Sequence, residues 1–337
     1  MNDLSRAAVL PAVEQSAALA VSARGLVKCF GEVRAVDGID LDVARGMIFA
    51  ILGPNGAGKT TLMRMLATLC SPDAGSATVM GHDLVTAPQE VRANIALTGQ
   101  FASLDEDLTG RENLLLLARL WGFRGRAAAA RADDLLAAFD LSDAAHRQVK
   151  AYSGGMRRRL DIGASLVVAP GVLFLDEPTT GLDPNARHGV WRMIRALAAA
   201  GVTILLTTQY LDEADQLAAR IAVIDKGRKI AEGTSRELKA ATGSGFFHVV
   251  LADPARLAEA ARLMEARLSG PVQRSAEGAE LSIMARTPKA ANEALAALIA
   301  ADIELAGFSM GSPSLEEVFF ALTSASRECE TIEEEAA

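Results

Sequence analysis

The feature that most constrains this chain is a stretch that fits the phosphate-loop pattern G-x-x-x-x-G-K-[ST]: Gly53-Pro54-Asn55-Gly56-Ala57-Gly58-Lys59-Thr60. The apolar run at 47–52 predicts a buried strand before it, and the spacing at 61–67 predicts a helix after it. This order suits the motif, because the glycines turn backbone N–H groups toward a polyphosphate and the helix N-terminus adds partial positive charge. The alternative is a glycine-rich turn that binds nothing.

The side chains of this segment suggest their roles. We expect Lys59 to reach the β- and γ-phosphates of a nucleotide and the Thr60 hydroxyl to take a position on Mg²⁺. The candidate nucleotide-binding residues here are Gly53, Pro54, Asn55, Gly56, Ala57, Gly58, Lys59, Thr60 and Thr61.

Two adjacent carboxylates, Asp176 and Glu177, directly follow the apolar run at 172–175. Carboxylates after a buried strand are costly unless they meet a cation or exchange protons. With a phosphate loop upstream, we expect Asp176 to organise the Mg²⁺ shell and Glu177 to orient and deprotonate the attacking water. Their order and context match a Walker B strand, and an exposed turn with two acidic residues is the alternative.

Composition narrows the class of protein. The 337 residues suggest two or three folding units, at about 150 residues per domain. The net charge of −8, from 34 basic and 42 acidic residues, argues against general affinity for nucleic acid. The three cysteines form no pair, which suits a reducing compartment, and the four histidines show no ligand spacing. The longest apolar candidate, 162–175, is interrupted by Pro170 and Gly171, whereas a membrane span needs about 20 residues.

The hydrophobic pattern predicts an α/β chain with a second, smaller domain. Alternation at 20–28 and 38–43 indicates half-buried strands, and the runs at 172–175 and 202–206 indicate parallel strands covered on both faces. The pattern between 108 and 145 is helical. From about residue 244, three strands and three helices are expected in a small α+β domain. The expected ranges are a loose tail at 1–19, a main domain at 20–239, a linker at 240–244, a second domain at 245–323 and an acidic tail at 324–337.

Between the phosphate loop and the carboxylates lies Tyr152-Ser153-Gly154-Gly155-Met156. This segment resembles the signature motif of the ATP-binding cassette (ABC) family, whose usual form is Leu-Ser-Gly-Gly-Gln, although Tyr152 and Met156 depart from it. A serine and two glycines that open a helix present a hydroxyl and backbone N–H groups to a phosphate. Ser-Gly-Gly alone is usually a turn, but its place between the two other motifs favours the signature.

The resemblance covers residues 20–236 and implies further site residues. Gln100 resembles the Q-loop glutamine, which touches Mg²⁺ and senses the membrane partner, and Asp183 lies in a segment similar to the D-loop. Phe30 occupies the place of the aromatic residue that stacks on adenine, with a buried core phenylalanine as the alternative. The family implies a P-loop NTPase core with an antiparallel β subdomain, a helical subdomain at about 101–160, and ATP and Mg²⁺ as cofactors.

One position departs from the family in a way that bears on chemistry. Gln209 stands where the switch histidine is usual. An amide can donate to a γ-phosphate but cannot become cationic as imidazole can. We therefore expect Gln209 to sense phosphate while Glu177 carries the base role alone. Gln209, Tyr152, Met156 and the segment 314–319 resemble the daunorubicin-resistance subgroup of drug and lipid exporters, whose permease is a separate chain.

The resemblance also implies partners. One signature and one phosphate loop per chain imply a head-to-tail homodimer with two sandwiched ATPs, in which Ser153, Gly154 and Gly155 serve the opposite subunit. The chain is expected at the cytoplasmic face of the membrane, bound to a permease near residues 101–107. A soluble ABC ATPase of DNA repair or translation is the alternative, although coiled coils, zinc cysteines and a second cassette are absent. A GTPase is disfavoured because no Asn-Lys-x-Asp motif is present.

Overall fold

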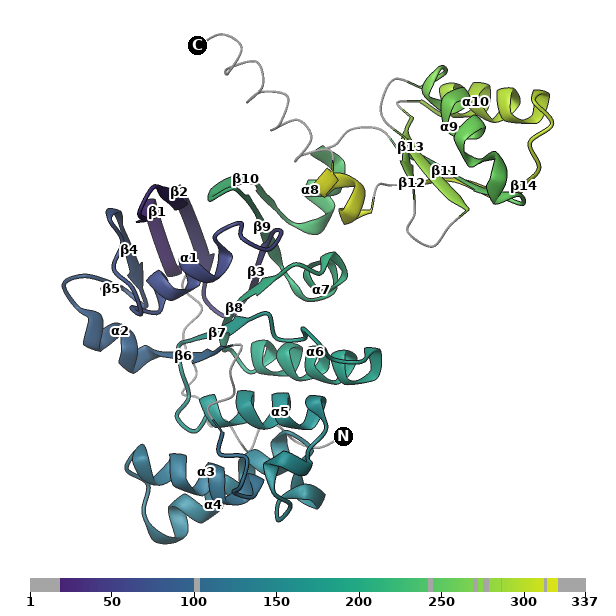
Figure 1. Cartoon of the computed structure of the whole chain (residues 1–337). Coiled ribbons are helices and arrows are strands. Elements are labelled where there is room, and N and C mark those ends of the chain that lie inside the picture. Colours follow the sequence, from purple (N-terminus) through teal and green to yellow (C-terminus); the bar gives the residue numbers. More distant parts are fainter. Residues whose placement is uncertain are drawn as a thin grey trace. The chain divides into compact units, whose positions relative to one another are not determined.

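A computed structural model describes residues 19–99, 104–241, 245–268, 272–274, 279–285, 287–311 and 314–320 (Figure 1). Contacts divide the chain into two compact units, Met1–Thr234 and Ser235–Ala337. Helix α8 (Ser235–Ala241) falls in the second unit, so the linker predicted from residue 240 begins inside a helix. The predicted tails at 1–19 and 324–337 lie almost wholly outside the described residues.

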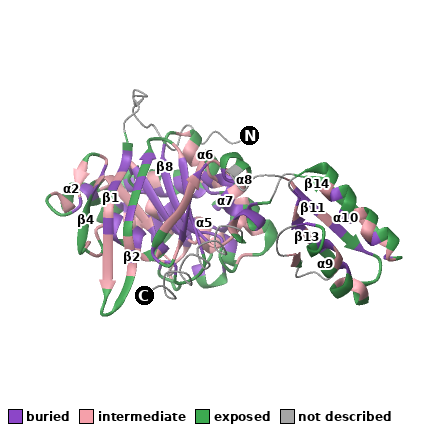
Figure 2. Ribbon diagram, turned by 90° about the horizontal axis from the view of Figure 1, so that it is seen from above, coloured by how far each residue is buried: buried purple, intermediate pink, exposed green. Residues whose placement is uncertain are grey.

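The first unit is built on a six-stranded sheet that is parallel except for one edge strand. Its strands, in sheet order, are β10 (Arg228–Gly233), β9 (Arg220–Asp225), β3 (Ile48–Leu52), β8 (Thr203–Thr208), β7 (Val172–Asp176) and β6 (Ile95–Thr98). All residues of β3, β7 and β8 are buried, which confirms the prediction from their continuous apolar runs. Figure 2 shows β8 within the buried centre of this unit. Because β3, β7 and β8 pair in one sheet, the predicted site segments that follow them start at fixed positions relative to one another.

Helices pack on this sheet and lead away from its carboxyl end. Helix α1 (Lys59–Leu66) contacts β7 and β8, α6 (Pro184–Ala199) contacts β8, and α7 (Leu211–Leu217) contacts β3 and β8. The expected strand–helix–strand arrangement of β7, α6 and β8 is confirmed. Each of these helices therefore begins next to the edge where the parallel strands end.

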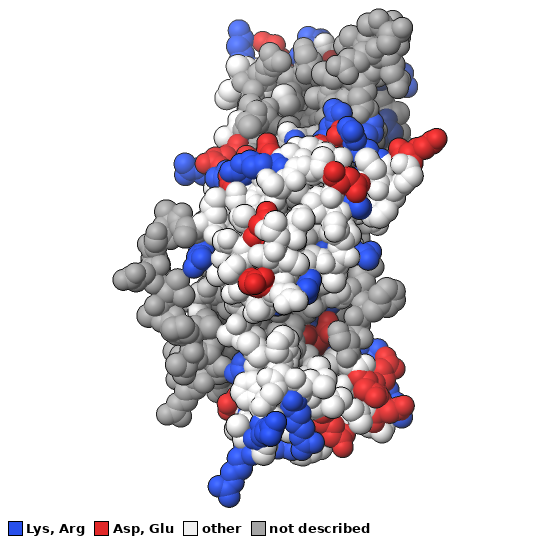
Figure 3. All heavy atoms as spheres, turned by 90° about the vertical axis from the view of Figure 1, so that its left-hand side faces the viewer, with Lys and Arg blue, Asp and Glu red and all other residues white. Residues whose placement is uncertain are grey.

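An antiparallel sheet lies beside the central sheet in the order β2-β1-β4-β5. The strands are β1 (Leu19–Phe30), β2 (Val33–Ala44), β4 (Ala74–Val79) and β5 (His82–Asp83), and α2 (Pro88–Asn94) follows them. Figure 3 shows acidic and basic side chains interspersed over one face of the molecule.

Three helices form the helical region that the sequence predicts: α3 (Gly110–Leu120), α4 (Gly125–Ala138) and α5 (Gly154–Ser165). Thr109 and Glu112 form a reciprocal capping box that starts α3. Helix α5 contacts both α3 and α4, and it also contacts β6 and α6. The signature segment is thus placed on a helix that joins the helical region to the central sheet.

The second unit contains an antiparallel sheet in the order β12-β13-β11-β14. Its elements are β11 (Phe246–Leu251), α9 (Leu257–Glu265), β12 (Gln273–Arg274), β13 (Glu280–Met284), α10 (Pro288–Ala300) and β14 (Leu305–Gly311), and residues 315–320 are helical. Apart from the short β12, this is the predicted order of strands and helices. Within the described residues, no helix combines the length and apolar composition needed to cross a bilayer.

Candidate nucleotide-binding site

The predicted site segments collect at the carboxyl end of the central parallel sheet. The phosphate loop follows β3, Glu177 follows β7, and Gln209 follows β8. Register places Leu52 beside Thr208 and Asp176 beside Thr207, so the three segments leave neighbouring strands. Parallel α/β sheets bind ligands in the crevice at this edge. Gln100 follows β6 but lies outside the described residues.

The glycines of the phosphate loop are required by close backbone contacts. A Cβ at Gly53 would lie 2.2 Å from the Ile224 carbonyl oxygen, and one at Gly58 would lie 2.1 Å from that of Ala35. Gly58 also has φ of +99°, in the left-handed region that glycine adopts most readily. The loop therefore tolerates no larger side chain at either position.

The side chain of Lys59 is buried and hydrogen-bonded to backbone carbonyl groups of the phosphate loop. Its side chain is 3% exposed, and Nζ donates to the carbonyl oxygens of Gly53 at 2.8 Å and Pro54 at 2.9 Å. The Nζ atom also lies 3.7 Å from Glu177 Oε1. Burial lowers the pKa of Lys59, and the charges of Glu177 and Asp176 oppose that effect. A buried ammonium with this environment is suited to exchange its carbonyl partners for phosphate oxygens.

The donor set around Asp176 has the chemistry of a magnesium site. Thr60 Oγ1 donates to Asp176 Oδ1 at 3.2 Å, and the hydroxyl of Thr207 donates to the same carboxylate oxygen. Mg²⁺ in nucleotide sites takes one or two protein oxygens and completes its shell with waters and phosphate oxygens. The hydroxyl of Thr60 and the carboxylate of Asp176 fit that requirement. Among the described residues, no group of three His, Cys, Asp or Glu side chains could hold a metal alone.

Glu177 has an unusual backbone and a well-held side chain. Its φ is +47°, although it carries a Cβ, and its N–H donates to the Thr207 carbonyl oxygen at 3.2 Å and to Thr207 Oγ1 at 3.1 Å. Thr180 Oγ1 donates to Glu177 Oε2 at 3.1 Å. Non-glycine residues in the left-handed region concentrate at functional sites. One carboxylate oxygen is thus occupied by Thr180, while Oε1 is directed toward Lys59.

The signature residues begin α5. Ser153 is exposed and caps the helix, with Oγ accepting from the Met156 N–H at 3.3 Å. A Cβ at Gly155 would lie 2.7 Å from the Ala186 Cβ, so glycine allows α5 to pack closely on α6. A hollow of about 400 Å³ joins Gly154 to Glu177. The structure therefore brings the signature helix and the predicted base to one groove.

The tyrosine that replaces the usual leucine of the signature has a structural explanation. Tyr152 is 7% exposed and its hydroxyl donates to the Ala144 carbonyl oxygen at 2.7 Å. A Cβ at Gly110 would lie 2.2 Å from that hydroxyl oxygen. The tyrosine thus anchors the start of α5 to the helical region, and Gly110 leaves room for it.

Three other predicted residues lie at the surface or near it. Phe30 is 56% exposed and has Lys28 Nζ 5.7 Å from its ring centroid, which excludes the buried-core alternative. Asp183 is exposed and caps α6 by accepting from the Ala186 N–H at 3.0 Å. Gln209 is half-buried and directly follows β8.

Comparison with known proteins agrees with this geometry. The ABC transporter family profile matches residues 36–180. The daunorubicin/doxorubicin resistance ATP-binding protein of Streptomyces peucetius is 55% identical over 304 residues, which cover 90% of this chain and 92% of that protein. The doxorubicin resistance ATP-binding protein of Mycobacterium tuberculosis (strain ATCC 25618 / H37Rv) is 44% identical, over 90% of this chain and 94% of that protein. This chain belongs to the ABC transporter ATP-binding family.

A solved structure confirms the ABC ATPase fold of the first unit. An ATP-binding cassette of an ABC transporter, in its ADP conformation, matches with a TM-score of 0.59 and 28% identity, over 65% of this chain and 92% of that chain. The chain is thus an ATP-hydrolysing transport ATPase, and the soluble non-transport alternative is not favoured.

Sequence reasoning missed three polar residues that organise this ABC site. Thr207 binds both the Asp176 carboxylate and the Glu177 backbone. Arg158 reaches the Walker B segment from α5. Glu213 is fully buried on α7, and its Oε1 accepts from Thr179 Oγ1 at 2.8 Å and from Trp191 Nε1 at 3.0 Å. Thr207 follows the apolar run of β8, whereas Arg158 is one of three consecutive arginines and Glu213 follows another acidic residue, so no common local pattern marks the three.

We expect Glu213→Gln to change how stability depends on pH. Burial raises the pKa of Glu213, against hydrogen bonds from Thr208, Thr179 and Trp191 and the charge of Arg187. The folded state therefore holds the proton more tightly, so Glu213 lowers the free energy of unfolding as pH rises above its unfolded pKa of about 4.5. Glutamine keeps an oxygen acceptor and carries no charge. Denaturant unfolding should show the variant gaining stability relative to wild type as pH rises above about 4.5; parallel curves would contradict this.

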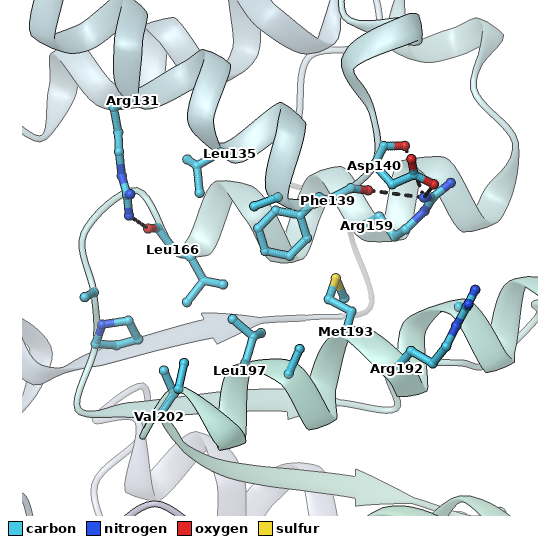
Figure 4. Close-up of a pocket in the computed structure, with 16 residues that line it drawn as sticks. Arg131, Leu135, Phe139, Asp140, Arg159, Leu166, Arg192, Met193, Leu197 and Val202 are labelled. Atoms are coloured by element: carbon cyan, nitrogen blue, oxygen red, sulfur yellow. Dashed lines mark hydrogen bonds and ion pairs between the residues drawn. The ribbon is translucent and has the colours of Figure 1, made fainter. Parts of the chain in front are cut away.

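A cavity of about 310 Å³ lies elsewhere in the first unit, between α4 and α6 (Figure 4). Leu135, Leu166 and Leu197 line it, and Arg159 is hydrogen-bonded to Asp140 at one side. None of the predicted nucleotide-site residues is part of its lining. It is therefore separate from the ATPase site.

Proposed function

We propose that this chain binds and hydrolyses ATP to energise efflux of a drug, antibiotic or lipid-like compound through a separate membrane permease. The observation that carries the proposal is the cluster of Lys59, Asp176 and Glu177, with Lys59 Nζ 3.7 Å from Glu177 Oε1 at the end of the phosphate loop. A buried ammonium beside paired carboxylates matches the requirements of phosphoryl transfer to water.

Each residue of the candidate nucleotide-binding site has a proposed role. The loop N–H groups and Lys59 bind the phosphates of ATP, and Phe30 offers its exposed ring to the adenine. Thr60, Asp176 and Gln100 would hold Mg²⁺, which would neutralise negative charge on the phosphate groups. Glu177 orients the attacking water and accepts its proton, since Thr180 leaves Oε1 available. Gln209 donates to the γ-phosphate and stays neutral.

The remaining site residues are proposed to act across a homodimer. Ser153 and Gly154 are exposed at the start of α5, and the chain has one signature and one phosphate loop. Placed against a second copy, Ser153, Gly154 and Gly155 serve the partner's nucleotide, and the exposed Asp183 is proposed to act in the same interface. ATP binding then closes the dimer and hydrolysis reopens it.

The names of relatives support the proposed export of a cargo through a membrane partner. Two are named as daunorubicin or doxorubicin resistance ATP-binding proteins, and that of Ralstonia nicotianae (strain ATCC BAA-1114 / GMI1000) is named a Nod factor export ATP-binding protein. Drug resistance in the first two names and export in the third support efflux as the process that this chain energises. We place this chain at the cytoplasmic face of the membrane, held there by its permease.

Affinity purification from detergent-solubilised native membranes tests the proposal. We expect one multi-spanning protein to copurify in stoichiometric amount with the tagged chain, because transport needs a membrane part that no described helix supplies. Deleting that partner's gene should raise sensitivity to the exported compound. Recovery of a soluble partner alone, or of no partner, would contradict the exporter assignment while leaving ATP hydrolysis in place.

A further inference from the structure

Arg158, on the second turn of α5, connects three separate segments of the chain. Its Nε donates to the Pro178 carbonyl oxygen at 2.9 Å, Nη2 to that of Asp176 at 3.2 Å, and Nη1 to that of Gly99 at 3.0 Å. Nη1 also lies 3.3 Å from Asp161 Oδ2. All three guanidinium nitrogens are therefore used: Nε and Nη2 bind the segment 176–178, and Nη1 binds Gly99 and Asp161.

The carbonyl groups that Arg158 holds are placed on either side of the predicted base. Asp176 precedes Glu177 and Pro178 follows it, and Glu177 has the strained φ of +47°. On the other side of the turn, Glu177 N–H donates to Thr207. Arg158 and Thr207 thus hold the left-handed turn from both sides. Because the turn fixes the Cα–Cβ direction of Glu177, these bonds also determine where its carboxylate points.

The third carbonyl extends the link beyond the Walker B segment. Gly99 directly precedes Gln100, and the signature residue Ser153 caps the N-terminus of α5. One side chain therefore joins the signature helix, the segment before Gln100 and the turn of Glu177. A displacement of either of the first two changes the geometry of the third.

The surroundings of Arg158 require this full set of bonds. Its side chain is 13% exposed and that of Asp161 is 5% exposed. Burial lowers the pKa of Arg158, and the charges of Asp161, Glu213 and Asp176 oppose that effect. A buried cation is stable only when its donors are satisfied. A lysine ammonium lacks the planar fork that reaches three carbonyl groups at once.

We propose that Arg158 is a positioning residue for ATP hydrolysis: it holds the turn that carries Glu177 and couples that turn to the signature helix and to the segment before Gln100. This inference rests on the proposed function, since it assigns to Glu177 the role of base. It predicts that loss of Arg158 impairs turnover and spares ATP affinity, because none of its bonds contacts the phosphate loop or the ring of Phe30.

The test compares Arg158→Gln and Arg158→Lys with wild type, using the full chain in membranes that contain its permease. We expect kcat to fall about 100-fold in both variants, since small misplacements of a catalytic group have effects of that size. The dissociation constant for ATP, measured on the purified full chain with a fluorescent analogue, should stay within about twofold of wild type. In Arg158→Ala, added ethylguanidinium should restore part of kcat.

Arg159→Gln is the matched control. Arg159 is the next residue of α5 and also donates to two carbonyl oxygens and one carboxylate, but these belong to Phe139 and Asp140. The Arg159→Gln variant should have a lower melting temperature than wild type and an unchanged kcat. The proposal is overturned if Arg158→Gln only melts earlier with kcat unchanged, or if kcat and ATP affinity fall in parallel. An active wild type with an inactive Glu177→Gln in the same assay would keep the proposed function standing in either case.

Discussion

Glu177→Gln is expected to reduce ATP hydrolysis by a factor of about 100 to 10,000, the range found when a general base is lost. Glutamine has nearly the same shape and can still accept from Thr180, whose hydroxyl lies 3.1 Å from Glu177 Oε2. It cannot accept a proton from water. Because the phosphate loop is unchanged, ATP affinity should remain near the wild-type value. Phosphate release by the full chain with its permease measures the effect.

Two further variants define what this result means. Glu259→Gln makes the same chemical change at an exposed residue of the second unit, paired with Arg256, and should leave turnover unchanged. Gln209→Ala should lose less activity than Glu177→Gln, because Gln209 is proposed to sense phosphate and not to move protons. Substantial ATPase activity in Glu177→Gln would rule out Glu177 as the sole base.

Lys59→Met should weaken ATP binding by about tenfold to 100-fold, since a hydrogen bond to a charged group contributes about 1.5–3 kcal/mol. Methionine fills a similar volume but carries no charge, and Lys59 is the buried ammonium nearest the predicted phosphate position. Turnover should fall further, because the same ammonium stabilises charge in the transition state.

Lys150→Met is the control for Lys59→Met. Lys150 is exposed and pairs with Asp107 at 3.0 Å, an interaction that contributes little to stability. Titration of both variants with a fluorescent ATP analogue separates loss of binding from loss of turnover. An ATP dissociation constant for Lys59→Met within twofold of wild type would exclude a phosphate-binding role.

The central sheet was predictable because its strands are buried on both faces. Continuous apolar runs identify β3, β7 and β8, whose residues are all buried. Strand β6 (Ile95–Thr98) was missed, since it is four residues long, lies at the sheet edge and is mostly half-buried. Helix α7 was missed as well, because its seven residues are too few to display a helical period.

The site was predictable only where its residues are close in the sequence. The phosphate loop and the Asp176–Glu177 pair each form a short motif whose spacing shows their chemistry. Arg158 and Thr207 act through partners that are distant in the sequence: Gly99 is 59 residues from Arg158, and Asp176 is 31 residues from Thr207. Such contacts depend on strand order and helix packing, which no local pattern contains. The sequence motif identifies α5 as the signature helix, but it does not indicate a role for Arg158.

The left-handed backbone conformation of Glu177 affects which substitutions at this position would stabilise the protein. A non-glycine residue at φ +47° raises the free energy of the folded chain by roughly 1–2 kcal/mol, whereas glycine or asparagine accepts that conformation more easily. Stability alone would therefore favour replacing the acid. Engineering that ranks variants by thermal tolerance will enrich inactive proteins at this position. Selection for a working ATPase acts in the opposite direction and keeps the chain below its attainable stability.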